Sequence, residues 1–392
     1  MRIAIVGARL AGSYAGLLLA RLGHEVLLFD PNTDGEKPCG GGVTAKALRK
    51  MPWFGCHPLP HNRIDRLRLT TTDGCSSEIR LRDPLFIYSR ATLDSSLRDE
   101  ALRAGARLVP ERAVRFSRNN GSWVIKTAGA EYEAGFLVGA DGAGSSVRGA
   151  TGAKHASADL SLALGYYIPG LYHPDTVMAS FQEGGFQGYL WSFPRVDHSS
   201  VGILCWLPAA RSDELRRRVL AFIQRQYPKA CSEMRFYAAR IPCLSRQTLL
   251  RQRVCGQNWA LLGDAAGFAD AITAEGIYFA LRSAELLAEA VRCGTPQSYE
   301  SSWRRDFGTD LLKAAQWRDR FYGGTLLFQA FTKRSVQLIR SSPTVRRLTD
   351  AVISGYRGYR GLRRQLMLQS PRILLETLRH RFAEKLQLTL EL

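Results

Sequence analysis

The chain has 392 residues, with 54 Lys and Arg against 35 Asp and Glu, which gives a formal net charge of +19. This length is long for one hydrophobic core and predicts two closely joined lobes. No apolar run approaches the roughly 20 residues that cross a bilayer, and the eight cysteines show no pairing pattern or metal-ligand spacing. An integral membrane protein, a metal centre and a disulfide scaffold are therefore excluded. We expect no secretory leader, because Gly7 interrupts the first apolar run, and we expect a cytoplasmic protein.

Residues 1–30 predict the strand, turn, helix and strand of a dinucleotide-binding unit. Gly7 and Gly12 lie in the turn, where the N-terminus of the following helix attracts phosphate groups. Asp30 ends the second strand 23 residues after Gly7, about the spacing at which a carboxylate meets the ribose of a dinucleotide. The expected elements are strands over residues 2–6 and 25–29 and a helix over residues 13–22.

Arg9 occupies the position of the middle glycine in this turn. In a G-x-G-x-x-G motif that glycine lets the backbone approach the pyrophosphate. Two alternatives stay open: Arg9 turns outward and adds a positive charge beside the phosphates, or it blocks them and the site is weak or dead. We favour the first, because the rest of the unit is intact and a helix N-terminus still attracts anions.

Cys39 is followed by three glycines at positions 40–42. Consecutive glycines remove side chains where a flat ring and a substrate would stack, and they leave Cys39 as the only reactive group of the loop. Its thiol either donates a proton to a substrate carbon or only shapes the pocket. The alternative is a tight turn with an inert cysteine.

Two further joins between a strand and a helix follow. Arg90 comes after a predicted strand that ends at Tyr88, and Asp94 lies four residues later. Asp141 lies in a Gly-rich return after an apolar strand over residues 136–138. Each join alone is typical of an ordinary loop, and their order along the chain gives them weight.

Three aromatic residues alternate along a predicted strand that ends at Pro194. Tyr189, Trp191 and Phe193 therefore share one face of the strand and form an apolar wall. For an isolated stripe of this kind, the core of a sheet is the usual explanation.

The most informative stretch begins with Gly263 and Asp264, directly after an apolar strand over residues 259–262. A helix with apolar residues at helical spacing is predicted to start near Gly276. Its backbone N–H groups and positive N-terminal end would form a position where an anion can bind. Asp264 would accept hydrogen bonds from a sugar hydroxyl. An ordinary turn with a capping Asp is the alternative, and the length of the stretch argues against it.

The C-terminal region is basic and amphipathic. The last 62 residues hold 13 basic and 4 acidic residues among apolar positions. Short helices interrupted by glycine and proline are predicted here. Such a region either rests on an anionic membrane or forms a solvated face. Nucleic acid is not an expected partner, because no recognition motif accompanies the charge.

The order of these motifs resembles the flavoprotein hydroxylase and reductase superfamily, which has a glutathione-reductase-type FAD fold. The Cys-Gly-Gly loop and the segment Tyr189–Pro194 resemble the geranylgeranyl reductase family within it. The resemblance implies an α/β fold with a Rossmann-like FAD-binding lobe, an interleaved antiparallel-sheet substrate lobe and a helical C-terminal tail. The expected division is an FAD-binding domain over 1–155 and 251–300, a substrate-binding sheet domain over 156–250 and a basic helical region over 301–392.

The resemblance also implies a function: reduced FAD saturates C=C bonds of a prenyl chain, with Cys39 as the catalytic residue. Tyr189, Trp191 and Phe193 would bind the chain. The implied FAD contacts are Gly7, Arg9, Gly12, Asp30, Gly40, Gly41, Arg90, Asp141, Gly263, Asp264, Gly267 and Gly276. No second dinucleotide turn is present, so the electron donor, NAD(P)H or a reduced carrier protein, stays open.

Two other functions are compatible with the pattern. A flavin monooxygenase or halogenase has a similar aromatic strand motif, Trp-x-Trp-x-Ile-Pro. A non-catalytic lipid-binding or partner-binding relic is the third possibility, since Arg9 replaces a glycine. No metal is expected, and the location would be cytoplasmic or peripheral at the inner face of the membrane.

Overall fold

The computed structural model describes residues 1–392 except 33, 153, 171, 183, 229–232 and 391–392. Over these residues, a parallel sheet of five strands forms the first lobe, in the order β16-β10-β1-β2-β6. Its strands are almost wholly apolar because both faces of the sheet are covered. The strands are β1 (Arg2–Val6), β2 (Glu25–Phe29), β6 (Arg107–Val109), β10 (Phe136–Gly139) and β16 (Trp259–Leu261).

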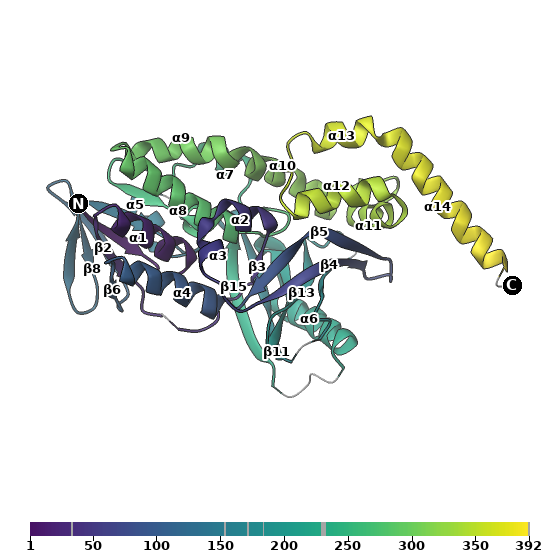
Figure 1. The fold of residues 1–392 in the computed structure, drawn as a ribbon, viewed down its shortest axis with the longest axis horizontal. Helices are drawn as coiled ribbons and strands as arrows, with labels where there is room; N and C mark the ends of the chain where they lie inside the picture. Colours follow the sequence, from purple (N-terminus) through teal and green to yellow (C-terminus); the bar gives the residue numbers. More distant parts are fainter. Residues whose placement is uncertain (33, 153, 171, 183, 229–232, 391–392) are drawn as a thin grey trace.

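Helices α1 (Leu10–Arg21), α4 (Arg90–Arg103) and α8 (Ile277–Arg292) pack side by side against this sheet. The other face contacts a small antiparallel sheet, where Phe29 meets Tyr132 at a centroid distance of 5.1 Å. That sheet consists of β7 (Arg115–Asn119), β8 (Ser122–Lys126) and β9 (Glu131–Ala134). The arrangement aims the carboxyl ends of β1 and β10 and the N-termini of α1 and α8 toward the second lobe (Figure 1).

In the second lobe, eight strands of the described chain form a curled sheet in the order β15-β11-β14-β13-β12-β4-β5-β3. The neighbouring pairs are antiparallel except β12 with β4, which run parallel, so the sheet is mixed where a purely antiparallel one is predicted. Helix α6 (Ser212–Gln226) covers its outer face at β11 and β14. The strands are β3 (Gly42–Val43), β4 (His61–Thr71), β5 (Ser76–Tyr88), β11 (Leu160–Pro169), β12 (Thr176–Phe181), β13 (Gly188–Pro194), β14 (His198–Trp206) and β15 (Arg235–Pro242).

The C-terminal helices lie along one side of both lobes and then leave the body (Figure 1). Helices α11 and α12 pack on β5, and α14 extends beyond them as a projecting arm. Among the described residues, every helix is too short or too polar to span a bilayer. These helices are α10 (Thr309–Gly323), α11 (Phe331–Ser341), α12 (Pro343–Ile353), α13 (Leu362–Leu368) and α14 (Ser370–Leu390).

Short helices complete the chain between these elements: α2 (Ala45–Lys50), α3 (Pro52–Cys56), α5 (Ser146–Thr151), α7 (Arg246–Arg251), α9 (Tyr299–Trp303) and a π-helical turn (Arg304–Gly308). A two-stranded ribbon, β17 (Thr325–Leu326) and β18 (Gln329–Ala330), precedes α11.

The predicted fold class is confirmed, and the strands of the dinucleotide unit lie where the sequence places them. Helix α1 starts at Leu10 rather than Ser13, because Arg9 takes extended backbone angles and acts as the N-cap. Strands from residues 42–88 join the second sheet, so the two lobes are interleaved. The exact domain boundaries stay a prediction.

Candidate active site

A cavity of roughly 300 Å³ lies between the two lobes. Its walls come from the loop at Cys39, the aromatic strand β13, the loop before α8 and the segment between α12 and α13. The predicted site residues that line it are Arg9, Cys39, Gly40, Gly41, Arg90, Tyr189, Trp191, Phe193, Asp264 and Gly276. The structure thus brings together residues that are up to 267 positions apart in the chain (Arg9 and Gly276).

Among the residues that the structure describes, six other predicted FAD contacts do not line the cavity. They lie in the turns behind its wall: Gly7, Gly12, Asp30, Asp141, Gly263 and Gly267. Gly7 has φ +97°, and a Cβ there would clash with the backbone of Ala140. Asp30 Oδ2 accepts a hydrogen bond from the N–H of Ala8 at 2.8 Å, which fixes the Gly-rich turn against the end of β2. The remaining lone pairs of Asp30 leave room for a ribose hydroxyl.

Asp141 has a structural task in this fold. It caps α5 by accepting hydrogen bonds from the N–H and the hydroxyl of Ser146, both at 2.7 Å, and from the hydroxyl of Ser145. Gly267 has φ +78°, and a Cβ there would clash with Leu244. Direct contacts of these two residues with a cofactor stay predictions.

The glycines after Cys39 let an aromatic ring pack directly on the loop. A Cβ on Gly40 would lie 2.9 Å from the ring of Phe193. Gly41 has φ +81°, and a Cβ there would clash with the carbonyl oxygen of Tyr88. The N–H of Gly41 lies 3.3 Å from Cys39 Sγ and points its hydrogen at the sulfur. The loop therefore presents a half-buried thiol beside an aromatic wall.

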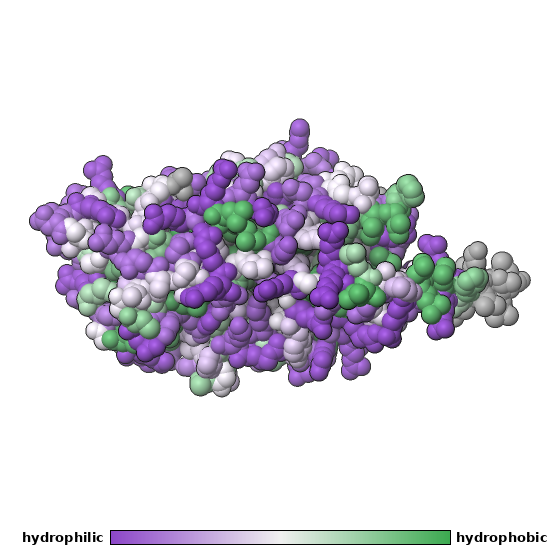
Figure 2. Space-filling model, turned by 90° about the horizontal axis from the view of Figure 1, so that it is seen from above, coloured by the Kyte–Doolittle hydropathy of each residue, from purple (hydrophilic) through white to green (hydrophobic). Residues whose placement is uncertain are grey.

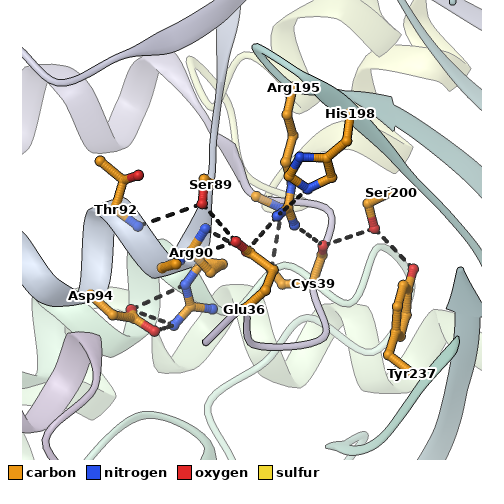
Figure 3. Close-up of polar contacts among 12 residues, drawn as sticks. Glu36, Cys39, Ser89, Arg90, Thr92, Asp94, Arg195, His198, Ser200 and Tyr237 are labelled. Atoms are coloured by element: carbon orange, nitrogen blue, oxygen red, sulfur yellow. Dashed lines mark hydrogen bonds and ion pairs between the residues drawn. The ribbon is translucent and has the colours of Figure 1, made fainter. Parts of the chain in front are cut away.

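A buried polar cluster holds this loop in place (Figure 3). Arg195 Nη2 donates to the carbonyl oxygen of Cys39 at 2.6 Å, and the hydroxyl of Ser200 donates to the same oxygen at 3.0 Å. Ser200 also hydrogen-bonds the hydroxyl of Tyr237 at 2.9 Å. Arg195, directly after β13, and Ser200 of β14 thus position one carbonyl group of the loop, and Tyr237 of β15 holds Ser200.

Glu36 connects this cluster to the first lobe. Its carboxylate pairs with Arg195 and accepts hydrogen bonds from the hydroxyl of Ser89 at 2.6 Å and the N–H of Arg90 at 2.5 Å. The Arg195 and Glu36 side chains are only 0% and 5% exposed. Burial opposes ionisation of Glu36, but Arg195 and the hydrogen bonds at the start of α4 outweigh it and hold its pKa below the usual range. Sequence reasoning missed both residues, since neither lies in a motif.

Asp94 gathers two arginines at the edge of the cavity. Arg90 donates to it at 2.8 Å, and Arg9 Nη1 donates to it at 3.1 Å. Burial lowers the pKa of Arg90, but Asp94 and Cys39 together raise it by more, so the net shift is upward. The guanidinium therefore stays charged beside the thiol. Arg9 is turned toward α4 rather than across the Gly-rich turn. This direction agrees with the favoured alternative, in which Arg9 adds positive charge without filling the phosphate position.

The N-termini of α1 and α8 are suited to an anionic cofactor. Within the described chain, neither helix has a side-chain cap or an acidic residue in its first turn, whereas α4, α5 and α7 are each capped by a serine. Lys37 Nζ lies 3.1 Å from Asp264 Oδ2 between these two helix ends. A positively charged end with free N–H groups fits a pyrophosphate, so the residues present fit FAD.

Glu275, in the loop before α8, is an acidic residue that lines the cavity. Burial and the neighbouring Asp270 raise the pKa of Glu275 to about 7. Glu275 Oε1 accepts a hydrogen bond from the hydroxyl of Thr44 at 3.4 Å. Burial lowers the pKa of Lys46 on the same wall. The described residues contain no group of three or more His, Cys, Asp or Glu side chains suited to a metal ion.

The last wall of the cavity is the segment after α12. Tyr359 donates its hydroxyl to Asp270 at 3.2 Å. Gly355 and Gly358 lie so close to the body that a Cβ would meet Lys46 at 2.5 Å and would clash with Asp310, respectively. The segment therefore forms one wall of the cavity, with its glycines packed directly on Lys46 and Asp310.

The family model for tryptophan halogenases matches residues 66–300, more than half of the chain. The chain belongs to the tryptophan halogenase family. This member of the family is 28% identical over 343 residues to digeranylgeranylglycerophospholipid reductase 2 of Methanothermobacter thermautotrophicus, with 81% of this chain and 86% of the relative covered. It is 29% identical over 329 residues to the chloroplastic geranylgeranyl diphosphate reductase of Oryza sativa subsp. japonica, with 75% and 67% covered.

Solved structures show the same fold for this tryptophan halogenase family member. A geranylgeranyl bacteriochlorophyll reductase-like protein from Thermoplasma acidophilum superposes with a TM-score of 0.77 at 19% identity, with 93% of this chain and 98% of the other covered. A flavin-dependent brominase superposes with a TM-score of 0.65 at 17% identity, with 95% and 100% covered. The predicted relationship to the geranylgeranyl reductases is confirmed, and with it the prediction of an oxidoreductase enzyme.

Proposed function

We propose that this protein is an FAD-dependent oxidoreductase that reduces C=C bonds of a prenyl chain. The observation that carries the proposal is the cavity itself, in which the loop of Cys39 faces Tyr189, Trp191 and Phe193. The reductase names of the curated relatives support the same reaction class.

The N-terminus of α1 would hold the pyrophosphate of FAD, and Asp30 would accept from a ribose hydroxyl. Arg9 and Lys37 would add positive charge on either side. When bound there and reduced, FAD would be the source of the hydride that an alkene carbon receives. Gly7 and Gly12 are required by the turn itself, because a Cβ on either would clash with backbone atoms, and this turn supports the proposed pyrophosphate position.

The protein's own residues supply the rest of the reaction. The aromatic wall excludes water and orients an apolar chain that offers no charged handle. The Cys39 thiol gives its proton to the second alkene carbon and becomes a thiolate, so the alkene gains one hydride and one proton. The Gly41 N–H and the Arg90 guanidinium both interact with Cys39 and hold its sulfur in place.

A halogenase or monooxygenase is the second candidate, since the family match and the fold of the brominase favour it. Cys39 and its three glycines argue for reduction, because oxygen chemistry needs no proton donor of this kind beside the substrate. The proposal allows two electron donors, NAD(P)H or a reduced carrier protein. It also includes a peripheral position at an anionic membrane.

The test is an absorbance spectrum of the purified protein, followed by anaerobic reduction with dithionite and addition of a geranylgeranyl substrate. We expect flavin bands that bleach on reduction and return when the alkene is added. Reoxidation by oxygen alone would support the halogenase or monooxygenase reaction. A folded protein that takes up no added FAD would contradict both reactions.

A further inference from the structure

Helix α14 turns its apolar side to solvent. Four side chains form this surface, here called the apolar stripe: Leu374, Leu375, Leu378 and Phe382, with exposures of 61%, 50%, 43% and 66%. Their spacing places them on one side of a helix with 3.6 residues per turn. Helix α13 continues the surface with Met367 and Leu368, which are 64% and 70% exposed. Apolar side chains are visible on the projecting arm in Figure 2.

The opposite side of α14, which carries the partly buried Ile373, is docked on the body through polar contacts. Glu376 accepts hydrogen bonds from the N–H and hydroxyl of Thr344, at 3.0 and 2.9 Å, and from the hydroxyl of Ser342 at 2.5 Å. The hydroxyl of Thr377 lies 3.3 Å from that of Ser341. An ordinary surface helix buries its apolar side and exposes its polar one. This helix does the reverse, so its apolar stripe needs another apolar environment.

Basic side chains border the apolar stripe. At 100° per residue, Arg379 falls on one edge and Arg381 on the other, while Arg372, on the same edge as Arg379, pairs with Glu376 at 3.1 Å. Arg363 and Arg364 lie on α13, while Glu376, the acidic residue among positions 362–383, is directed at the body. A helix with an apolar stripe between arginines is typical of binding in the plane of an anionic membrane surface.

The chain passes from the cavity wall directly into helix α13. The segment from Val352 to Tyr359 lines the cavity, and α13 begins at Leu362. A surface bound through α13 and α14 would therefore lie close to the C-terminal wall of the cavity.

We propose that α13 and α14 form a docking surface for an anionic lipid bilayer, with the apolar stripe at the boundary between headgroups and acyl chains. The inference rests on the proposed function for one point only, the delivery of a prenyl lipid from that bilayer into the cavity. A second copy of the chain fits the surface less well, because a two-fold contact would bring the arginine borders of both copies together.

The test is sedimentation of the full chain with vesicles of phosphatidylcholine alone or with phosphatidylglycerol added. We expect at least tenfold stronger binding to the anionic vesicles. The variant L374E/L378E/F382E should lose at least tenfold of that binding. Replacing the two border arginines in R379Q/R381Q should weaken it by about fivefold per charge, and only for the anionic vesicles.

The matched control is V114E/V196E, which adds charge at positions on the body that are 58% and 47% exposed, and it should bind like the wild type. Equal binding of the wild type and the L374E/L378E/F382E variant would overturn the proposal. So would a wild-type dimer in solution that the same variant converts to a monomer. The flavin spectrum and the anaerobic reaction with detergent-dissolved substrate test the proposed function separately, and the charge variants should leave both unchanged.

Discussion

Replacement of Glu36 by Gln tests whether the buried pair with Arg195 joins the two lobes. Gln has almost the same shape as Glu, so the variant removes the charge and leaves the Arg195 guanidinium buried without its counter-ion. Since the two side chains are 0% and 5% exposed, we expect the free energy of unfolding to fall by about 3 to 5 kcal/mol, the usual cost of breaking a buried pair.

Urea denaturation at pH 7, with Glu214→Gln as the matched control, measures this cost. Glu214 pairs with Arg218 on the surface, where the side chains are 38% and 34% exposed, so its loss should cost less than about 1 kcal/mol. Equal losses in the two variants would refute the argument from burial.

The pH dependence gives a second check on Glu36. Its pKa is lowered in the folded state, so the stabilisation is present above the ordinary glutamate value of 4.5 and is lost as the pH falls through the folded value. The difference between wild type and Glu36→Gln should therefore shrink as the pH is lowered below 4.5.

Four further substitutions test the site. Cys39→Ala should lower alkene reduction at least tenfold and leave the flavin spectrum intact; unchanged turnover would remove Cys39 from the mechanism. Trp191→Ala should weaken prenyl binding about tenfold in a titration. An unaltered affinity would show that Trp191 is part of the sheet core and does not bind the substrate. Arg9→Gly should change FAD affinity by less than about tenfold if Arg9 stays paired with Asp94, whereas a large gain would show that Arg9 blocks the site. The wild type should lose stability as the pH rises from 4.5 through about 7, because Glu275 keeps its proton in the folded state and releases it in the unfolded chain. Glu275→Gln should remove this loss, and equal shifts of the urea midpoint in both proteins would contradict the argument.

Local patterns predict the first lobe well. The strands at residues 2–6 and 25–29, the loop of Cys39 and the turn at Asp264 each depend on neighbouring residues, and the structure places them as expected. Apolar runs bounded by glycine are enough to find such elements.

Contacts between distant single residues follow no such pattern. Glu36 and Arg195 are 159 positions apart, and Lys37 and Asp264 are 227 apart, and nothing in the spacing of charges selects these partners. The parallel pairing of β12 with β4 also joins distant segments, so the sequence pattern predicts an antiparallel sheet and not the mixed sheet of the structure. These partners are selected only when the two lobes fold against each other.

The close approach of Gly355 and Gly358 has a consequence for the size of the substrate. Lys46 and Asp310 stand where the methyl group of an alanine at either position would be, so the missing side chains determine how deep the cavity is on this side. A methyl group at position 355 would meet the Cβ of Lys46 at 2.5 Å, so the segment or helix α2 would have to shift, whereas at position 358 the carboxylate of Asp310 can rotate away. The shape of the cavity can thus be altered at position 355 while every aromatic residue of strand β13 stays the same.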